Sequence, residues 1–467
     1  MTLALVLVET SLLATLVSGA TLYWAPWALS DPIELSTVLS QALALAICCI
    51  VAFYYNDLYD LRVVRGFGAF AVRLVQALGT AFILLAVFYT FFPHTQLADG
   101  PFLSSIVLIV GLLLPLRAVS YAVMRSRPFL ERVLILGTGP LAAEILAEIR
   151  RQPHFRYAVA GLVSDGRSGA PAAVAGVPVL GALEQVETIV RGVKPARIVT
   201  TLTERRGQLP VRELLEARFF LGAVVEDGVE VYERLTGKLA IETLRPSSLL
   251  FAQDFHRYRM DRAVARGLSF ATALVALVIT APLCLLVALA IRLDSAGGVL
   301  FRHERLGLRG RPFELLKFRT MHPAPVASEW VRDNERRITR IGAWLRRFRL
   351  DELPQFVNVL RGDMNLVGPR PHPVTNRALF EAHIPYYGLR SLVRPGLTGW
   401  AQIRQGYAND LAEETEKMRY DLYYIKHFSL SLDVRILVDT VKIVLFGRGA
   451  RAADAYQAGQ ALEVTPR

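Results

Sequence analysis

The stretch "GLSFATALVALVITAPLCLLVALAI" (Gly267–Ile291) carries no charged residue and is long enough to form a membrane-spanning helix. Its flanks argue against a simple span, because arginines lie on both sides and basic flanks stay on the cytoplasmic side of a bilayer. Pro282 lacks an N–H group and breaks or kinks a helix. We therefore expect a re-entrant hairpin over 267–291 that enters the inner leaflet and returns. The alternative is an ordinary span with a tolerated proline.

The first quarter of the chain contains four more apolar segments, at about 3–24, 37–55, 74–92 and 102–120. Loops with and without arginine alternate between them, which predicts that both ends of this unit face the cytoplasm. We expect a four-helix transmembrane domain over 1–125, with the buried core of a soluble domain as the alternative. The 467 residues are 53% hydrophobic and carry a net charge of +12, which favours lipid headgroups and phosphorylated substrates as partners. No nucleic-acid-binding signature is present, so nucleic acid is not an expected partner.

The stretch "RVLILGTGPLAAEILAEIRR" (Arg132–Arg151) reads as a buried strand, a glycine-rich turn and a helix. Gly137, Gly139 and Ala142 fit the G-x-G-x-x-A pattern, which lets backbone N–H groups approach a pyrophosphate. Asp165 follows the next predicted strand, where a ribose-binding acid could lie. These features predict an α/β Rossmann-like domain over 131–250. Nucleotide binding and a structural or regulatory role both remain open, because the same turn also serves close packing of helix on strand.

The stretch "RLDELPQFVNVLRGDMNLVGPRP" (Arg349–Pro371) contains two adjacent carboxylates near its start, Asp351 and Glu352. The apolar spacing predicts a short amphipathic helix from Glu352 to Arg361, closed by Gly362. Asp351 has two interpretations. It could cap this helix, or, ringed by arginines, it could stay ionised and act as a nucleophile on phosphorus. In the second case Glu352 is the natural ligand for Mg²⁺.

Basic residues precede this carboxylate pair. A strand over 312–321 is predicted to present Lys317 and Arg319, and a helix over 338–349 leaves Arg340 and Arg346 off its apolar stripe. Exposed arginines are usually a solvated face. Their density beside a lipid-facing hairpin and a carboxylate pair favours phosphate binding instead.

Four motifs resemble the bacterial sugar transferase family of monotopic polyprenyl-phosphate phosphoglycosyl transferases: the 349–371 stretch, "KFRTM", "RPGLTGWAQI" (Arg394–Ile403) and "YDLYYIKHFSLSLD" (Tyr420–Asp433). The whole chain resembles the large form of this family, a multi-domain membrane protein. Its parts would be a four-helix transmembrane bundle, a Rossmann-like (CoA-binding-like) domain and, over 255–467, an α+β catalytic domain with the re-entrant helix. The ending "VKIVLFGRGAR" (Val441–Arg451) is similar to an exosortase-associated exopolysaccharide subgroup.

The resemblance implies that the chain transfers a sugar-1-phosphate from a UDP-sugar to undecaprenyl phosphate and releases UMP. Asp351 would be the nucleophile and Glu352 would hold Mg²⁺. Arg346 matches the family's phosphate-binding arginine, and Pro282 matches its hairpin-breaking proline. The nucleotide would lie near the Pro-Arg-Pro motif, which is Pro369, Arg370 and Pro371.

The same resemblance implies a multi-pass protein of the bacterial inner membrane with its catalytic domain on the cytoplasmic face. Its product would pass to downstream exopolysaccharide glycosyltransferases. Two other functions are considered. A membrane-anchored nucleotide-sugar dehydratase is disfavoured, because no lysine here has a tyrosine four residues before it. A non-enzymatic scaffold would not need Asp351. The sequence leaves open which sugar is transferred, glucose and galactose being common choices, and whether the chain forms a homodimer.

Overall fold

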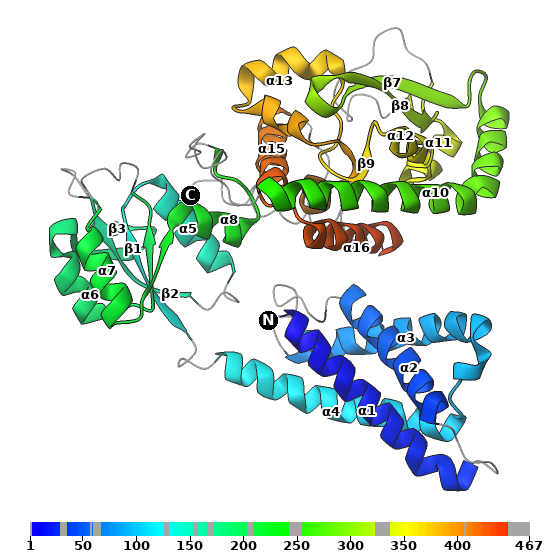
Figure 1. Ribbon diagram of the computed structural model, residues 1–467, viewed down its shortest axis with the longest axis horizontal. Coiled ribbons are helices and arrows are strands. Elements are labelled where there is room, and N and C mark those ends of the chain that lie inside the picture. Colours follow the sequence, from blue (N-terminus) through cyan, green and yellow to red (C-terminus); the bar gives the residue numbers. More distant parts are fainter. Residues whose placement is uncertain are drawn as a thin grey trace, which may run out of the picture.

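The computed structural model describes residues 2–28, 35–56, 58, 67–125, 130–152, 157–165, 172–202, 209–241, 255–322, 337–405, 408 and 410–446. Figure 1 shows three successive groups of elements: N-terminal helices, an α/β sheet and a larger C-terminal region. This order matches the predicted order along the chain.

Four long helices lie where the four apolar segments were predicted: α1 (Thr2–Ala28), α2 (Leu35–Tyr55), α3 (Phe67–Phe91) and α4 (Asp99–Arg125). They share a core that includes Phe53, Phe70 and Leu74, whereas Val75 and Ile83 are 71% and 68% exposed. Apolar side chains therefore cover the outer faces of these helices as well as the inner ones. In the described part of the chain, three helices are long and apolar enough to cross a membrane: Ser36–Tyr55, Phe70–Phe91 and Met260–Asp294.

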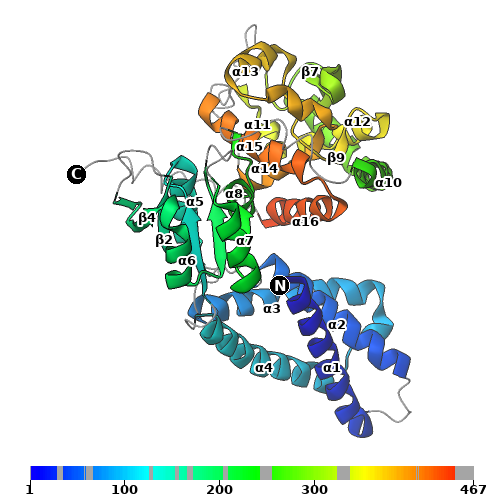
Figure 2. The same ribbon diagram turned by 60° about the vertical axis from the view of Figure 1, so that its left-hand side comes forward.

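The middle group is a six-stranded mixed sheet with the order β3-β4-β2-β1-β5-β6. All neighbouring strands are parallel except β3 and β4. Helices cover both faces, as Figure 2 shows. One core joins Ile145 and Val231 of α5 and α8, and another joins Val186 and Leu214 of α6 and α7. The predicted α/β architecture, a mostly parallel sheet between two layers of helices, is thus present. Its elements are β1 (Glu131–Leu136), α5 (Pro140–Arg151), β2 (Tyr157–Ser164), β3 (Ala173–Val174), β4 (Val177–Ala182), α6 (Val186–Val193), β5 (Arg197–Thr200), α7 (Val211–Phe220), β6 (Val224–Asp227) and α8 (Gly228–Thr236).

The C-terminal region is an α+β structure built on the long helix α10 (Phe255–Asp294). Two small sheets, β7–β8 and β9–β10, pack with helices around a core that includes Ala273, Leu315 and Val359. The elements after α10 are β7 (Leu300–Leu306), β8 (Pro312–Phe318), α11 (Arg340–Arg347), α12 (Gln355–Arg361), β9 (Asn365–Val367), α13 (Arg377–His383), β10 (Gly396–Thr398), α14 (Trp400–Arg404), α15 (Leu411–Lys426) and α16 (Leu430–Phe446).

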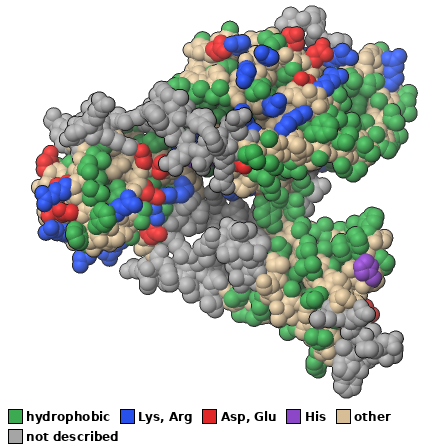
Figure 3. Space-filling model, viewed as in Figure 1, with side chains coloured by type: hydrophobic (Ala, Val, Ile, Leu, Met, Phe, Trp, Pro, Cys, Tyr) green, Lys and Arg blue, Asp and Glu red, His purple; other side chains and the backbone are tan. Residues whose placement is uncertain are grey.

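Helix α10 contains the apolar stretch of the predicted hairpin. It runs along one side of the C-terminal region and turns near its end toward β7 (Figure 1). Its hydrogen-bonded helix is continuous, and Pro282 lies inside it. We expected Pro282 to separate two helices of a hairpin. In the structure Pro282 instead lies within one continuous helix, with no loop at this point. Many large apolar side chains of α10 are exposed, among them Val278 at 68% and Ile279 at 72%. Hydrophobic side chains accordingly gather along the α10 side of this region in Figure 3.

Candidate active site

The two adjacent carboxylates lie in a short 3-10 turn, η8 (Leu350–Glu352), between α11 and α12. Arg349 precedes the turn with a left-handed backbone, φ 57°, which redirects the chain after α11. Asp351 and Glu352 are each only 8% exposed. Two carboxylates buried side by side need nearby positive charge to remain ionised.

Glu352 receives that charge directly. Its Oε1 atom lies 3.2 Å from Lys317 Nζ and 3.0 Å from Arg370 Nη2. Arg349 Nη1 is 4.0 Å from the same oxygen. Burial by itself would raise the pKa of Glu352, but the three cations outweigh it and hold the pKa well below its usual range. Glu352 is therefore a fixed negative charge that joins β8, η8 and the Pro-Arg-Pro segment.

Asp351 is in a different electrostatic position. Burial raises the pKa of its carboxyl and the charge on Glu352 adds to this effect, while Lys317, Arg346 and Arg370 oppose it. The nearby cations are shared with Glu352, so Asp351 is the less stabilised anion of the two. Such a carboxylate is the better nucleophile, because less of its charge is held by neighbours.

Arg346 is positioned by close packing of α11 against Thr320. Its Nε atom donates to Thr320 Oγ1 at 3.0 Å, and Thr339 caps the helix by accepting from Gly342 N at 2.9 Å. A Cβ atom on Gly342 would lie 2.1 Å from Thr320 O. Only glycine permits this approach, which brings Arg346 toward the carboxylate pair.

The Pro-Arg-Pro segment is held by a second buried network. Arg390 Nη2 donates to Asp421 Oδ2 at 2.7 Å and to Arg370 O at 2.8 Å. His372 Nε2 lies 2.9 Å from Glu414, and His372 Nδ1 is 2.9 Å from Tyr387 Oη. Burial and the charge of Arg390 lower the pKa of His372 to about 4. We infer a neutral ring that donates to Glu414 and accepts from Tyr387.

This network borders a small cleft of about 60 Å³. Its lining joins the carboxylate turn, the Pro-Arg-Pro segment and α15, namely Arg349, Arg370, His372, Arg390, Ala401, Gln402, Glu414, Lys417 and Asp421. Pro369 and Pro371 line an adjoining recess together with Arg370. Cationic groups thus face the space next to Glu352, which suits a phosphorylated ligand.

The structure brings most of the predicted site residues together but separates two of them. Lys317, Arg346 and Arg370 surround the carboxylates. Arg319 instead donates to Ser295 O at 2.7 Å and Ala296 O at 2.8 Å, so it fastens the loop after α10. Arg340 is an exposed residue at the opposite end of α11 from Arg346. Neither contacts Glu352.

The predicted helix after the carboxylates begins later than expected. Helix α12 starts at Gln355, with Pro354 as its first flanking residue and no side-chain cap. The interpretation of Asp351 as a helix cap is therefore wrong, because the proline-containing turn lies between Asp351 and the helix. The predicted end is correct, since Gly362 closes α12 with φ 92°.

The glycine-rich turn of the middle domain lies between β1 and α5, as predicted. Gly137 has φ 116°, and a Cβ atom there would lie 2.6 Å from Thr201 Oγ1. This contact gives Gly137 a packing role. Gly139 has open space at its Cβ position, and Asp165 directly follows β2, the neighbour of β1. Both interpretations of the turn, nucleotide binding and packing, thus remain available.

Glu352, the residue expected to hold Mg²⁺, supplies only part of a coordination shell. No group of three or more His, Cys, Asp or Glu side chains gathers for a metal in the part of the chain that the structure describes. Mg²⁺ commonly uses one or two carboxylates and completes its shell with water and substrate phosphates. Glu352 would supply one carboxylate to such an arrangement, in which water and a phosphorylated substrate provide the remaining oxygens.

Sequence reasoning missed the network behind the Pro-Arg-Pro segment. Glu414, Lys417 and Asp421 recur at positions i, i+3 and i+7 of α15 and therefore share one helix face. A buried stripe of charges at this spacing could have been detected. Its partners Arg390 and His372 could not, because they come from segments far away in the chain.

Comparison with known proteins agrees with the site. A model of the bacterial sugar transferase family matches residues 260–447, and a CoA-binding domain model matches residues 54–206. The second match begins within α2, so it covers part of the N-terminal helices as well as the sheet.

Several relatives share substantial identity with the chain. The chain is 40% identical over 226 residues to UDP-N-acetylgalactosamine-undecaprenyl-phosphate N-acetylgalactosaminephosphotransferase of Aeromonas hydrophila, covering 48% of this chain and 52% of the relative. It is 33% identical over 337 residues to undecaprenyl-phosphate glucose phosphotransferase of Komagataeibacter xylinus, covering 70% and 61%. The chain thus spans about half to three fifths of the length of these two relatives.

The third relative is shorter. The exopolysaccharide production protein PSS of Rhizobium leguminosarum bv. phaseoli is 43% identical over 190 residues, which cover 39% of this chain and 95% of the relative. No relative named here bears on the exosortase-associated subgroup, and the end of its motif, residues 447–451, lies outside the described residues. The chain belongs to the bacterial sugar transferase family.

Proposed function

We propose that this protein transfers a sugar-1-phosphate from a UDP-sugar to undecaprenyl phosphate and releases UMP, as the first membrane step of exopolysaccharide synthesis. The observation that carries the proposal is the buried Asp351–Glu352 pair with Lys317, Arg346 and Arg370 around it. The names of the relatives support the substrate classes, with glucose and N-acetylgalactosamine as the sugars they name.

In the first step, a carboxylate oxygen of Asp351 attacks the β-phosphorus of the UDP-sugar. The bond from that phosphorus to the oxygen bridging it to the α-phosphate breaks, and UMP leaves with the electron pair. The sugar phosphate is then attached to Asp351 as a mixed anhydride. The shared cations offset the repulsion between the attacking carboxylate and the diphosphate.

In the second step, a phosphate oxygen of undecaprenyl phosphate attacks the same phosphorus. The bond to Asp351 breaks and the carboxylate is regenerated, which leaves undecaprenyl-diphosphate-sugar. Glu352 keeps Lys317 and Arg370 in place through both steps, because its own charge stays fixed. A Mg²⁺ ion held by Glu352 and the substrate would supply further positive charge to the diphosphate.

Release of UMP tests this proposal. Purified protein in detergent or nanodiscs is given a panel of UDP-sugars with undecaprenyl phosphate, and UMP is measured. We expect Asp351→Asn to reduce UMP release on the order of 10³-fold or more, since the amide is not a nucleophile. Glu381→Gln, an exposed acid on α13 paired with Arg377, is the matched control and should retain wild-type release. Unchanged release by Asp351→Asn would show that Asp351 is not the nucleophile, whereas no release by wild type with any UDP-sugar would favour the scaffold alternative.

We also propose that α1 to α4 span the inner membrane and that α10 enters and returns, which leaves the catalytic domain on the cytoplasmic face. Both ends of the apolar run contact the same domain, which supports a return. Arg266 donates to Met364 O at 3.0 Å, and Asp294 accepts from Ile341 N at 3.3 Å. Pro282 lies between these ends, where a proline favours a kink.

A further inference from the structure

A second basic site lies outside the carboxylate site, beside the start of the apolar run of α10. It is a hollow of about 490 Å³. Its lining comes from α10, the turn between β7 and β8, and the segment before β10, and consists of Arg262, Ala263, Arg266, Leu308, Arg309, Leu392 and Arg394. We refer to it as the arginine hollow. None of its arginines takes part in the Asp351 site described above.

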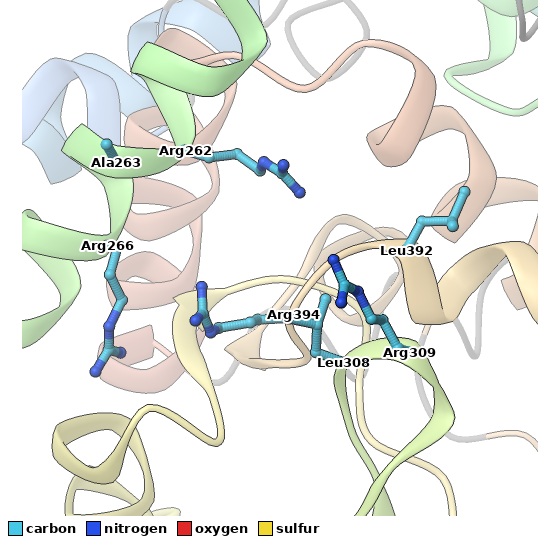
Figure 4. A pocket seen from close by; sticks show the side chains of 7 residues that line it. All are labelled: Arg262, Ala263, Arg266, Leu308, Arg309, Leu392 and Arg394. Atoms are coloured by element: carbon cyan, nitrogen blue, oxygen red, sulfur yellow. The ribbon is translucent and has the colours of Figure 1, made fainter.

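Two of the four arginines reach into the hollow from separate elements. Figure 4 shows Arg262 reaching from α10 and Arg309 reaching from the opposite side toward the same space. Arg266 and Arg394 are anchored by the backbone around Gly362. Arg266 Nη2 donates to Leu360 O at 3.3 Å, and Arg394 Nε donates to Gly362 O at 3.1 Å. These anchors fix part of each guanidinium and leave other N–H groups for a ligand.

Much of the positive charge of the hollow is carried by Arg266, Arg309 and Arg394. Within the described part of the chain, Arg266, Arg309 and Arg394 have no ion pair with a carboxylate. The nearby acid is Asp363, which accepts from Asn358 Nδ2 at 3.1 Å. Like charges held around one hollow repel one another. A bound anion would relieve this repulsion, and guanidinium groups match phosphate oxygens.

Apolar side chains around the hollow indicate what carries the phosphate. Leu308 and Leu392 line the hollow beside the arginines, and Leu392 is 54% exposed. The uncharged run of α10 begins at Gly267, one residue after Arg266. A ligand with a phosphate and an apolar body would contact both kinds of surface, whereas free phosphate would use only the arginines.

We propose that the arginine hollow binds the phosphate of an anionic phospholipid headgroup from the bilayer, with the lipid's apolar part against the start of α10. This site is separate from the carboxylate site and does not depend on the transfer reaction. Its role is to fix the depth and orientation of the catalytic domain on the membrane surface.

Lipid retention tests the proposal. The full chain in detergent is mixed with phosphatidylglycerol or phosphatidylcholine, and bound lipid is counted by native mass spectrometry. The double variant Arg262→Gln/Arg309→Gln should retain less phosphatidylglycerol, by about fivefold for each arginine removed. The double variant with lysines should retain it. Arg212→Gln/Arg218→Gln, which removes two exposed charges from α7, is the charge-matched control and should behave as wild type.

Two further experiments distinguish a phospholipid headgroup from inorganic phosphate and from polyprenyl phosphate as the ligand of the hollow. Inorganic phosphate at millimolar concentration should not displace phosphatidylglycerol, and displacement would overturn the proposal in favour of a free-phosphate site. Titration with polyprenyl phosphate forms the second arm. A raised KM for polyprenyl phosphate in the glutamine variant, with unchanged phosphatidylglycerol retention, would also overturn it, since the hollow would then hold the lipid substrate. Equal phosphatidylglycerol retention by wild type and the glutamine variant contradicts the proposal in either arm.

Discussion

Arg390 and Asp421 form an ion pair whose side chains are only 7% and 5% exposed. Arg390 also donates to the Arg370 carbonyl, so the pair fixes the backbone of the Pro-Arg-Pro segment. We expect Asp421→Asn to destabilise the catalytic domain by about 3–5 kcal/mol, because a buried guanidinium loses its counter-ion. Urea unfolding measures this loss. Asp410→Asn, an exposed helix cap of α15, is the control and should cost much less, since asparagine also caps helices.

His372 makes stability depend on pH. Its pKa is about 4 in the folded protein because burial and Arg390 disfavour the charged ring, whereas an unfolded histidine titrates near 6.5. Above pH 6.5 the His372 ring is neutral in both the folded and the unfolded protein, so it does not lower the free energy of unfolding. As the pH falls from about 6.5 to about 4, the unfolded state binds a proton that the folded state does not. Glu414, whose pKa is lowered to about 2, stays charged through this window.

We therefore expect the free energy of unfolding to fall by about 3 kcal/mol across that window from this group alone. The measurement is urea unfolding at pH 7 and pH 5. His372→Gln keeps a donor for Glu414 but cannot titrate, so its pH dependence should be smaller than that of wild type. An equal dependence in both proteins would assign the effect to other groups.

At the scale of elements, the fit of α11 against Thr320 depends on Gly342. An added methyl group would meet the backbone carbonyl of Thr320, which cannot rotate away. We expect Gly342→Ala to cost about 1–3 kcal/mol and to lower UMP release, because the displaced helix carries Arg346. Gly388→Ala is the matched control, since nothing lies within 4 Å of its Cβ position. Equal UMP release by Gly342→Ala and Gly388→Ala would show that activity does not depend on how Gly342 positions Arg346.

The membrane geometry of α10 also belongs to this scale. Cysteines introduced at Gly267 and Ser295 replace residues at the two ends of the apolar run, on a background without the native cysteines. If the helix returns, both should react with a membrane-impermeant thiol reagent only in inside-out vesicles. Labelling of the Ser295 position in right-side-out vesicles would instead indicate a complete span.

At the scale of the whole molecule, the middle domain is joined to the catalytic domain through α8 and α15. Glu233, which is 2% exposed, accepts from Lys426 Nζ at 2.8 Å and lies 2.9 Å from His427 Nε2. Trp400 Nε1 donates to Gly237 O at 2.8 Å beside this pair. The α2 helix is joined to α16 by Tyr54, whose hydroxyl donates to Asp439 Oδ1 at 2.9 Å.

We expect Glu233→Gln to loosen the contact between the middle and catalytic domains, because Lys426 loses its buried partner at a cost of about 3–5 kcal/mol. Hydrogen exchange should then rise in α8 and α15 together while the sheet core keeps its protection. Glu187→Gln, which removes an exposed pair with Arg191 on α6, should change neither helix. A rise confined to α8 would mean that the two domains are not coupled through this contact.

Local patterns in the sequence were enough to predict the order of the domains and most elements. The apolar segments, the strand–glycine–helix turn and Gly362 at the end of α12 depend on neighbouring residues, and all appear where they were expected. The sequence also singled out the carboxylate pair with Lys317, Arg346 and Arg370, and the structure brings these side chains together.

The sequence by itself determined which residues carry the charge, because composition and spacing reveal helix faces, breaks and clusters. Only the tertiary structure decided which charges meet. It placed Lys317 and Arg370 on the same Glu352 oxygen, turned Arg319 toward the loop after α10, and joined Arg390 to Asp421 across the domain. These pairings join segments far apart in the chain, and their energies depend on burial and distance, which no local pattern records.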